Sequence, residues 1–255
     1  MIETNAVYVI VAREFKKFIR EKSRMVSTIA RPVLWLFLIG GGMSRLVPSG
    51  ENVTYIQFIF PGILGMTVLF SSIFSSISII WDKEFGFMKE ILVAPVSRFT
   101  VVVGKATSGM VLSTFQAIIV LCLFPFIGLR IDLLQVIYIV LVSALLSFTL
   151  SAFGILLASF HENYESFSVI MNFIVMPMFF LSGAMYPVKL LPDVLKMVSK
   201  LNPLTYGIDA LKNILFPLET GRMGADFPLI VDLAVVASLA LIFVFVAGKT
   251  FERKQ

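Results

Sequence analysis

The sequence contains few of the residues that catalysis and metal binding most often use. Its 255 residues include one histidine and one cysteine. Cys122 lies in an apolar run and has no second cysteine to pair with, so a disulfide framework is excluded. His161 stands beside Glu162 in a short polar turn, without the second histidine that a zinc site normally needs. We therefore expect no metal site and no bound cofactor on this chain.

Charge is also scarce. Only 15% of the residues are charged and 58% are hydrophobic, whereas soluble domains are about 25% charged. This composition predicts an all-α integral membrane protein, whose first partner is the lipid bilayer. The formal net charge of +5 fits the Lys and Arg that membrane proteins accumulate on their cytoplasmic side, so we expect no nucleic-acid partner.

Six apolar runs are long enough to cross a bilayer. We predict a single transmembrane domain over residues 1–255, with six transmembrane helices within 28–248. Their ranges are 28–46, 56–80, 100–128, 133–160, 167–185 and 228–248. An even number of spans places both termini on one side, and the segments on that side carry twice as many Lys and Arg residues as the opposite segments. The positive-inside rule therefore predicts a multi-pass protein of the inner (plasma) membrane with cytoplasmic termini.

Residues 1–26 are predicted to form an amphipathic helix in the membrane interface. Val7, Val11, Phe15 and Phe18 share one helical face, and the cationic residues of the interfacial helix share the other: Arg13, Lys16, Lys17 and Arg20. A soluble amphipathic helix packed on a partner protein is the alternative.

The stretch WDKEFGFMKEILVAPVSR, residues 81–98, places six ionisable residues between two apolar runs. Burying six charges in a bilayer core would cost on the order of 15 kcal/mol, so this stretch is predicted to lie in the cytoplasm. Trp81, Phe85, Met88 and Leu92 recur at helical spacing and form a narrow apolar stripe. The pattern predicts a short amphipathic helix that starts near Trp81, with Asp82 and Lys83 on its polar side.

Residues 186–216 contain two short helical patterns, which begin at Pro192 and Pro203. Both are too short to cross a membrane. We expect them to be re-entrant or surface half-helices on the outer face.

Small and adaptable residues occupy three spans. Serines recur in the second span (Ser71, Ser72, Ser75 and Ser76) and the fourth (Ser143, Ser147 and Ser151), and we expect them to allow close helix packing rather than to bind substrate. The fifth span is rich in Met and Phe around Pro177, and its candidate residues for a substrate path are Asn172, Met176 and Phe179. Packing against lipid is the alternative for that span.

The sequence lacks a phosphate-binding loop. Near Gly104 and Lys105, Phe99 occupies the position of the first glycine of the Walker pattern and Ala106 that of the final hydroxyl residue. The chain is therefore not expected to be an enzyme by itself.

The order of these features resembles the permease subunits of type-2 ABC exporters, a family of drug, lipid and lipid-linked glycan exporters. The resemblance rests on the basic interfacial helix, FPG at 60–62, the 81–98 stretch followed by VGK at 103–105, and FLSGAMYPV with LNPLTYGIDALK on the outer side. It implies that residues 81–98 form a coupling helix that contacts a separate ABC ATP-binding subunit. The residues assigned to this contact are Trp81, Glu84, Phe85, Gly86, Glu90, Pro95 and Arg98.

The same resemblance also implies how the transporter is assembled. It implies a homodimer of this chain with two copies of the ATP-binding subunit, with ATP and Mg on that subunit. It also implies an outer gate, to which we assign Pro187, Pro192, Asn202, Pro203 and Tyr206. The alternatives are an ion-coupled secondary transporter, disfavoured because no span carries two acidic residues at helical spacing, and an intramembrane enzyme or structural protein.

Overall fold

The computed structural model of the protein describes residues 3–44, 46, 53–86, 96–161, 163–217 and 223–253. All regular secondary structure in these ranges is helical. The prediction of an all-helical chain is confirmed.

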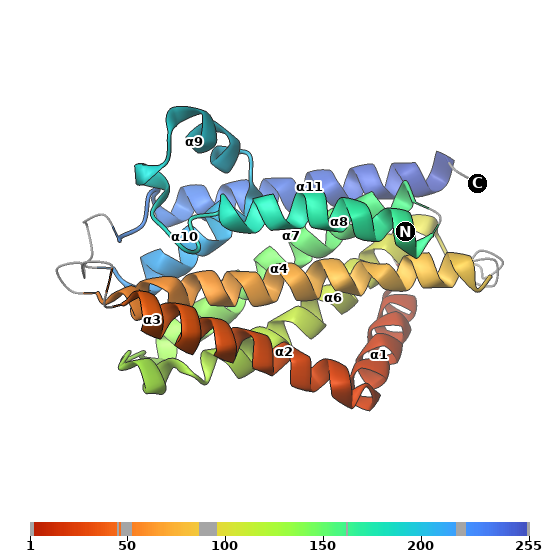
Figure 1. Cartoon of the computed structure of the whole chain (residues 1–255). Coiled ribbons are helices and arrows are strands. Elements are labelled where there is room, and N and C mark those ends of the chain that lie inside the picture. Colours follow the sequence, from red (N-terminus) through yellow and green to blue (C-terminus); the bar gives the residue numbers. More distant parts are fainter. Residues whose placement is uncertain are drawn as a thin grey trace.

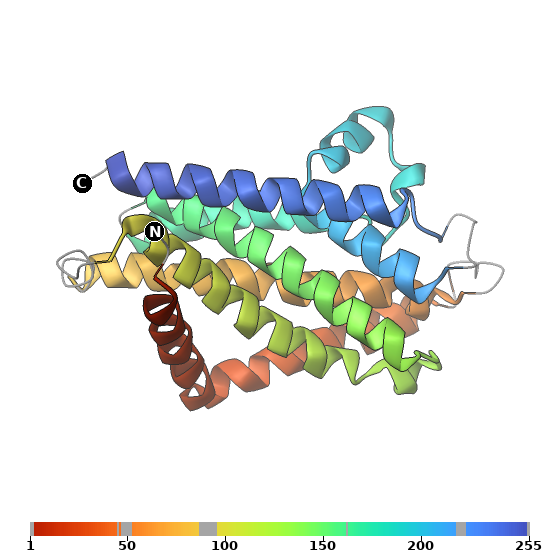
Figure 2. The same cartoon turned by 180° about the vertical axis from the view of Figure 1, so that it is seen from behind.

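Four long apolar helices form the body of the molecule: α4 (Tyr55–Glu84), α6 (Arg98–Leu121), α7 (Leu133–Ser159) and α11 (Leu229–Arg253). They lie side by side in both views of the ribbon (Figures 1 and 2). Each is long and apolar enough to cross a membrane. α6 ends before the predicted residue 128, because a short 3₁₀ turn that contains Pro125, Phe124–Ile127, follows it.

Two shorter apolar helices occupy the predicted first and fifth spans. α2 (Lys22–Leu34) continues through a π-helical segment, Trp35–Gly40, into α3 (Gly41–Met43). α8 (Tyr164–Phe180) ends before the predicted residue 185, and Gly183 in the turn that follows has a φ of 77°. The apolar parts of these two helices, Ala30–Met43 and Tyr164–Phe180, have fewer than 18 residues.

α1 (Thr4–Arg20) lies across one end of the bundle, steeply inclined to the long helices (Figure 1). Its Phe18 is buried, and Phe15 and Phe18 both contact the Phe115 ring of α6 edge-on. The inclination is typical of a helix that lies along a membrane surface rather than across it.

α9 (Asp193–Lys200) and α10 (Pro203–Leu215) lie at the opposite end of the bundle. The two short helices begin beside Pro192 and Pro203, as predicted. α9 is exposed and protrudes from the bundle, whereas α10 is buried against α4, α7 and α11. Only α10 therefore occupies the interior position expected of a re-entrant helix.

Small residues bring the central helices into close contact, and Ser72, Ser75 and Ser151 of the predicted serines lie at these contacts. Gly109 of α6 lies against Ser75 of α4 and Ser151 of α7, and a Cβ at Gly109 would collide with both hydroxyl groups. Ser72 also bonds Ser113 across the α4 and α6 contact, at 3.0 Å. Helices that approach this closely gain van der Waals contact, which drives association inside a membrane.

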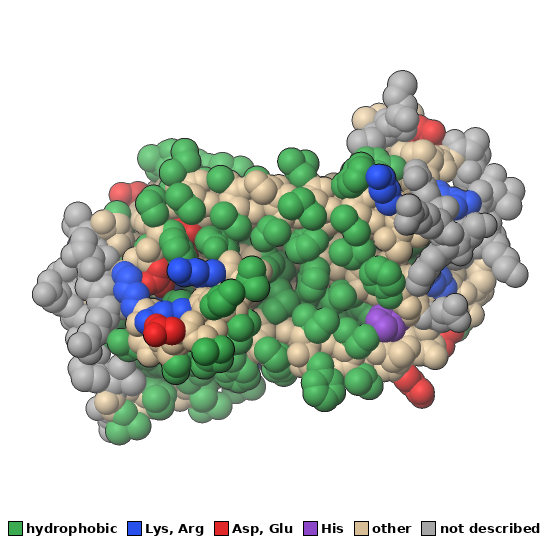
Figure 3. Space-filling view, turned by 90° about the horizontal axis from the view of Figure 1, so that it is seen from above, with side chains coloured by type: hydrophobic (Ala, Val, Ile, Leu, Met, Phe, Trp, Pro, Cys, Tyr) green, Lys and Arg blue, Asp and Glu red, His purple; other side chains and the backbone are tan. Residues whose placement is uncertain are grey.

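The face formed by α8 and α11 is apolar in its middle and charged towards both ends (Figure 3). Exposed apolar side chains of α8 and α11 include Phe173, Met176, Ile230, Leu241 and Phe245. An apolar band between two polar ends is the surface that a bilayer requires.

Candidate coupling site

Both ends of the predicted coupling segment lie at the end of the bundle where α1 is found. α4 ends at Glu84 and α6 begins at Arg98, so residues 85–97 connect two long helices that lie side by side. The segment 87–95 is outside the described residues.

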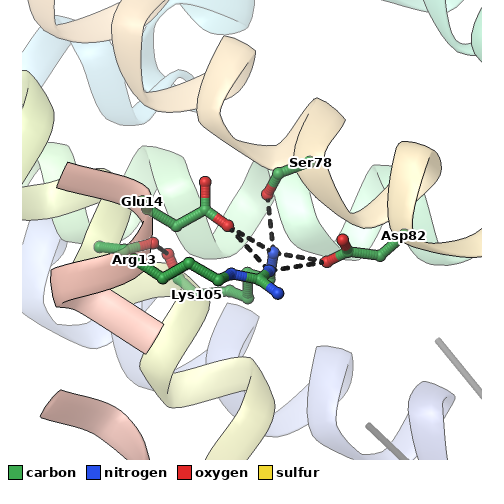
Figure 4. A network of polar contacts seen from close by, with 6 residues as sticks. Arg13, Glu14, Ser78, Asp82 and Lys105 are labelled. Carbon is green, nitrogen blue, oxygen red and sulfur yellow. Dashed lines mark hydrogen bonds and ion pairs between the residues drawn. The ribbon is translucent and has the colours of Figure 1, made fainter. Parts of the chain in front are cut away.

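A cluster of four charged residues joins α1 to α4 and α6 beside this segment (Figure 4). The Lys105 Nζ atom donates to Asp82 Oδ2 at 2.7 Å, to Glu14 Oε1 at 2.9 Å and to Ser78 Oγ at 3.0 Å. Arg13 Nη2 lies 3.2 Å from Glu14 Oε1 and 3.4 Å from Asp82 Oδ2. We call Arg13, Glu14, Asp82 and Lys105 the ion cluster.

Glu14, Asp82 and Lys105 of the ion cluster are buried, Arg13 is half exposed, and the formal charges of the four residues cancel. Only 3% of the Lys105 side chain is exposed, and its three N–H donors are all used. Burial raises the pKa of Glu14, but attraction and hydrogen bonding from Lys105, followed by those from Arg13, outweigh burial and hold the pKa below its ordinary value. A buried ion pair of this kind fixes geometry, because losing one partner leaves the other uncompensated.

Further contacts fix the two helix ends that flank the segment. Lys83 Nζ donates to the carbonyl oxygens of Ala158 and His161, both at 3.1 Å, at the end of α7. Arg98 donates to the Phe251 carbonyl oxygen of α11 at 3.3 Å. Ser97 caps α6 by accepting a hydrogen bond from the Thr100 N–H. Movement of residues 85–97 would therefore act on several helices at once.

The prediction of a separate helix that starts near Trp81 is wrong at its first turn. Trp81 to Glu84 form the last turn of α4. Asp82, predicted on the polar side of the coupling helix, is buried in the ion cluster, and Lys83 contacts α7. The Trp81 ring is partly buried and receives the Lys17 ammonium at 4.6 Å. The apolar core and the ion cluster extend α4 by one turn beyond its apolar run.

Three of the other predicted coupling residues, Glu84, Phe85 and Gly86, lie among the described residues at the end of α4. Glu84 is exposed, the Phe85 side chain is 71% exposed, and Gly86 has a φ of 79° that ends the helix. Glu90 and Pro95 lie outside the described residues.

The predicted cationic face of the interfacial helix divides into two pairs. Arg13 and Lys17 turn towards α4, where they contact Asp82 and Trp81. Lys16 and Arg20 are exposed. Two of the four cations therefore hold α1 on the bundle.

Sequence reasoning missed Glu14 and Lys105 as partners. The position of Glu14 along α1 was the available signal. Glu14 lies four residues after Ile10 and four before Phe18, in the middle of the face of α1 that packs on α6. Lys105 lies inside an apolar span, where a lone cation normally needs an acid.

Two of the predicted outer-gate residues, Asn202 and Tyr206, make hydrogen bonds around the start of α10. Asn202 Oδ1 accepts from the Leu204 N–H at 3.0 Å, and its Nδ2 atom donates to the Met178 carbonyl oxygen at 2.6 Å. The Tyr206 hydroxyl donates to the Lys200 carbonyl oxygen at 2.8 Å. Pro203 occupies the first turn of α10. Pro192 and Pro187 precede α9 and the short turn before it.

Two charged residues of α10, Asp209 and Lys212, are buried. Lys212 donates to the Gly183 carbonyl oxygen at 2.9 Å and lies over the Phe58 ring. Asp209 accepts from the backbone N–H groups of Asp226 and Phe227. These groups hold α10 and the start of α11 together.

The predicted substrate-path residues do not share one environment. Asn172 and Met176 line a cavity of about 140 Å³ between α4 and α8. Phe179 is buried and meets the Trp35 ring edge-on at 5.8 Å. Within the described residues, no group of three His, Cys, Asp or Glu side chains is placed to hold a metal ion.

Comparison with known proteins places the chain in a family. Residues 5–216 match the family described as ABC-2 type transporter. The putative transport permease ycf38 of Cyanophora paradoxa is 32% identical over 81% of this chain and 72% of its own length. The Escherichia coli inner membrane transport permease YadH is 25% identical over 95% of this chain and 93% of its own length. The probable multidrug ABC transporter permease YbhR of Escherichia coli is 29% identical over 64% of this chain and 45% of its own length.

The fold and the site define an integral membrane permease. The chain belongs to the ABC-2 type transporter family, as a membrane transport permease subunit. Membership implies an ATP-binding partner for a chain whose sequence lacks a phosphate-binding loop.

Proposed function

We propose that the chain is the membrane subunit of an ATP-driven exporter and that residues 85–97 receive the movement of a separate ATP-binding subunit. The ion cluster is the observation that carries this proposal. It joins α1 directly to the two helices that flank the segment. A push on the segment would then move α1, α4 and α6 together, as a rigid-body switch.

We further propose that all six apolar helices cross the inner (plasma) membrane, with both termini in the cytoplasm. α1, both ends of the described chain and the helix ends that flank residues 87–95 lie at one end of the bundle, and α9 and α10 lie at the other (Figure 1). A cytoplasmic position for the first end lets the coupling segment reach an ATP-binding partner. Pro187, Pro192, Asn202, Pro203 and Tyr206 then belong to the outer gate.

The active assembly in this proposal contains two copies of this chain and two ATP-binding subunits. ATP and Mg bind to the partner subunits, because the permease sequence has no phosphate loop. The substrate is a hydrophobic or amphipathic molecule, namely a drug, a lipid or a lipid-linked glycan. The Met and aromatic residues of α8, and the similarity to YbhR, a probable multidrug ABC transporter permease, support this class.

The test is ATP-driven uptake of a fluorescent amphiphile by inside-out vesicles that contain the chain and its cognate ATP-binding subunit. Wild-type vesicles should accumulate the amphiphile only when ATP is present. Glu84→Lys should abolish accumulation, because it reverses an exposed charge beside the coupling segment. Glu165→Lys is the matched control, since Glu165 is an exposed acid at the same end, in the first turn of α8.

Two results would count against the proposal. Undiminished transport by Glu84→Lys would separate this surface from coupling. Transport that continues without ATP and stops with an uncoupler would instead favour an ion-coupled secondary transporter.

A further inference from the structure

A cavity of about 300 Å³ lies between α2, α4, α6 and α8, near the end that carries the ion cluster. Its volume is at the lower limit for small-molecule sites, which span roughly 300–1,000 Å³. The cavity is not part of the coupling site, although Trp81 borders both: Lys17 lies against its ring, and the ring also lines the cavity.

Arg31, an exposed residue of α2, supplies a cation at the edge of the cavity. Arg31 lines it, and the guanidinium lies 5.2 Å from the centre of the Phe70 ring. No acid among the described residues forms an ion pair with Arg31. Glu21 also lines the cavity and has interactions of its own, and no ion pair between Glu21 and Arg31 is found among the described residues. A counter-charge supplied by a ligand would satisfy the guanidinium.

Two buried polar groups line the same cavity and lack protein partners. The Ser71 hydroxyl is buried without a hydrogen bond to any described residue. The Gln116 side chain is 3% exposed, and in the described part of the chain it too makes no hydrogen bond. Buried polar groups are normally satisfied, so an unused hydroxyl and an unused amide beside a cavity indicate a missing partner. Ser71, Gln116 and Arg31 all carry hydrogen-bond donors.

Aromatic residues line part of the remaining walls, and this part continues into a second cavity. Phe70, Phe74 and Tyr164 line both the first cavity and the one of about 140 Å³ beside it. The second cavity extends along α8 past Asn172 and Met176. The shape is therefore polar at Arg31 and apolar towards α8, which suits a molecule with one charged end and one hydrophobic end.

We propose that this paired cavity binds an anionic amphiphile, with a phosphate-like head group held by Arg31, Gln116 and Ser71 and its hydrophobic part along α8. The site deepens the proposed function because it specifies a substrate class. Only the role of the site in transport rests on that proposed function. Binding itself can be measured on the chain without an ATP-binding subunit, so failure of one proposal leaves the other intact.

The experiment uses tryptophan fluorescence of the purified full chain in a neutral maltoside detergent. The chain has two tryptophans, so Trp35→Phe leaves Trp81, in the cavity wall, as the sole reporter. Dodecyl phosphate should change Trp81 emission saturably. Arg31→Gln in this background should weaken binding by about tenfold or more, because a charge-assisted hydrogen bond is lost. Arg130→Gln is the matched control, since Arg130 is an exposed arginine in the turn between α6 and α7.

Two other probes separate head group from tail. Dodecyl glucoside, which has the same tail and no charge, should bind at least tenfold more weakly than dodecyl phosphate. Inorganic phosphate, which has no tail, should also bind more weakly. Equal binding of dodecyl glucoside, or unchanged binding by Arg31→Gln, would overturn the anionic site. Equal binding of inorganic phosphate would overturn the amphipathic part of the proposal.

A second pair of variants guards against loss of fold. Gln116→Leu leaves Arg31 in place and should weaken dodecyl phosphate binding a few-fold. Arg31→Lys keeps the charge and should bind more tightly than Arg31→Gln. Wild-type binding by Gln116→Leu together with equal binding by the two Arg31 variants would assign the signal to partition into the detergent micelle, and the proposal would fail.

Discussion

Lys105 of α6 and Asp82 of α4 form a 2.7 Å ion pair beside the segment that connects their helices. The two helices are thus joined twice, once by residues 85–97 and once by this pair. Glu14 extends the pair to α1 at 2.9 Å. The interfacial helix is therefore attached to the moving part of the proposed switch.

The first prediction concerns the loss of Lys105. Lys105→Met should lower the free energy of unfolding by about 3 kcal/mol, because Glu14 and Asp82 would remain buried without their main counter-charge. Thermal unfolding in detergent measures the loss. The triple variant Lys105→Met, Glu14→Gln, Asp82→Asn removes all three charges and should recover part of the stability. A triple variant less stable than Lys105→Met would show that the pair is not the cause.

The second prediction is a pH dependence carried by Glu14, whose pKa is lowered in the folded protein. A lowered pKa means that the stabilising contribution is present above the ordinary value of 4.5 and is lost as pH falls through the folded-state pKa. The difference in melting temperature between wild type and Glu14→Gln should stay constant from neutral pH to about pH 5 and shrink below pH 4.5. A difference that shrinks already between pH 7 and pH 6 would contradict this assignment.

The sequence was sufficient for the helices but not for the ion cluster. Apolar runs and prolines located each helix to within several residues, because hydrophobic length and helix breaking are local properties. The cluster joins positions 14, 82 and 105, and nothing local tells which acid meets which base. The charges that follow Trp81 in the sequence predict an exposed helix face, whereas contacts with Arg13 and Lys105 place the Asp82 side chain in the interior. The cavity at Arg31 likewise depends on the packing of four helices and has no local signature.

The third prediction compares two helix caps. Asn163 and Asn202 both accept a backbone N–H at the start of a helix, but only Asn202 also donates to a distant carbonyl, that of Met178. Asn163→Ala should cost about 1 kcal/mol, the usual value for a lost cap. Asn202→Ala should cost about 2 kcal/mol, because a buried hydrogen bond is lost as well. Equal losses of unfolding free energy in the two variants, measured by thermal or denaturant unfolding, would show that the hydrogen bond from Asn202 to Met178 adds no stability.

The fourth prediction is that replacing glycine by alanine changes the stability of the protein in opposite directions at two positions. Gly109→Ala places a methyl group against Ser75 and Ser151 and should destabilise the protein by about 1–3 kcal/mol through overpacking. At Gly41, also helical, a Cβ would meet nothing within 4 Å, so Gly41→Ala should stabilise by about 0.5–1 kcal/mol. The melting temperatures of both variants, measured in the same detergent, test the close approach of α4, α6 and α7. A neutral Gly109→Ala would mean that these helices are farther apart.

The last prediction tests whether Phe85 contacts the ATP-binding partner. Phe85 is 71% exposed at the end of α4, where a large apolar ring gains nothing from the fold of this chain. Phe85→Ala should leave the melting temperature of the isolated chain unchanged but weaken co-purification with the ATP-binding subunit, since an exposed aromatic residue is a typical anchor of an interface. Phe126, 74% exposed at the other end of the bundle, supplies the control: Phe126→Ala should alter neither property. If both variants retained the partner equally, docking would have to rest on other residues, and the exposed ring at Phe85 would have to be explained by contact with lipid.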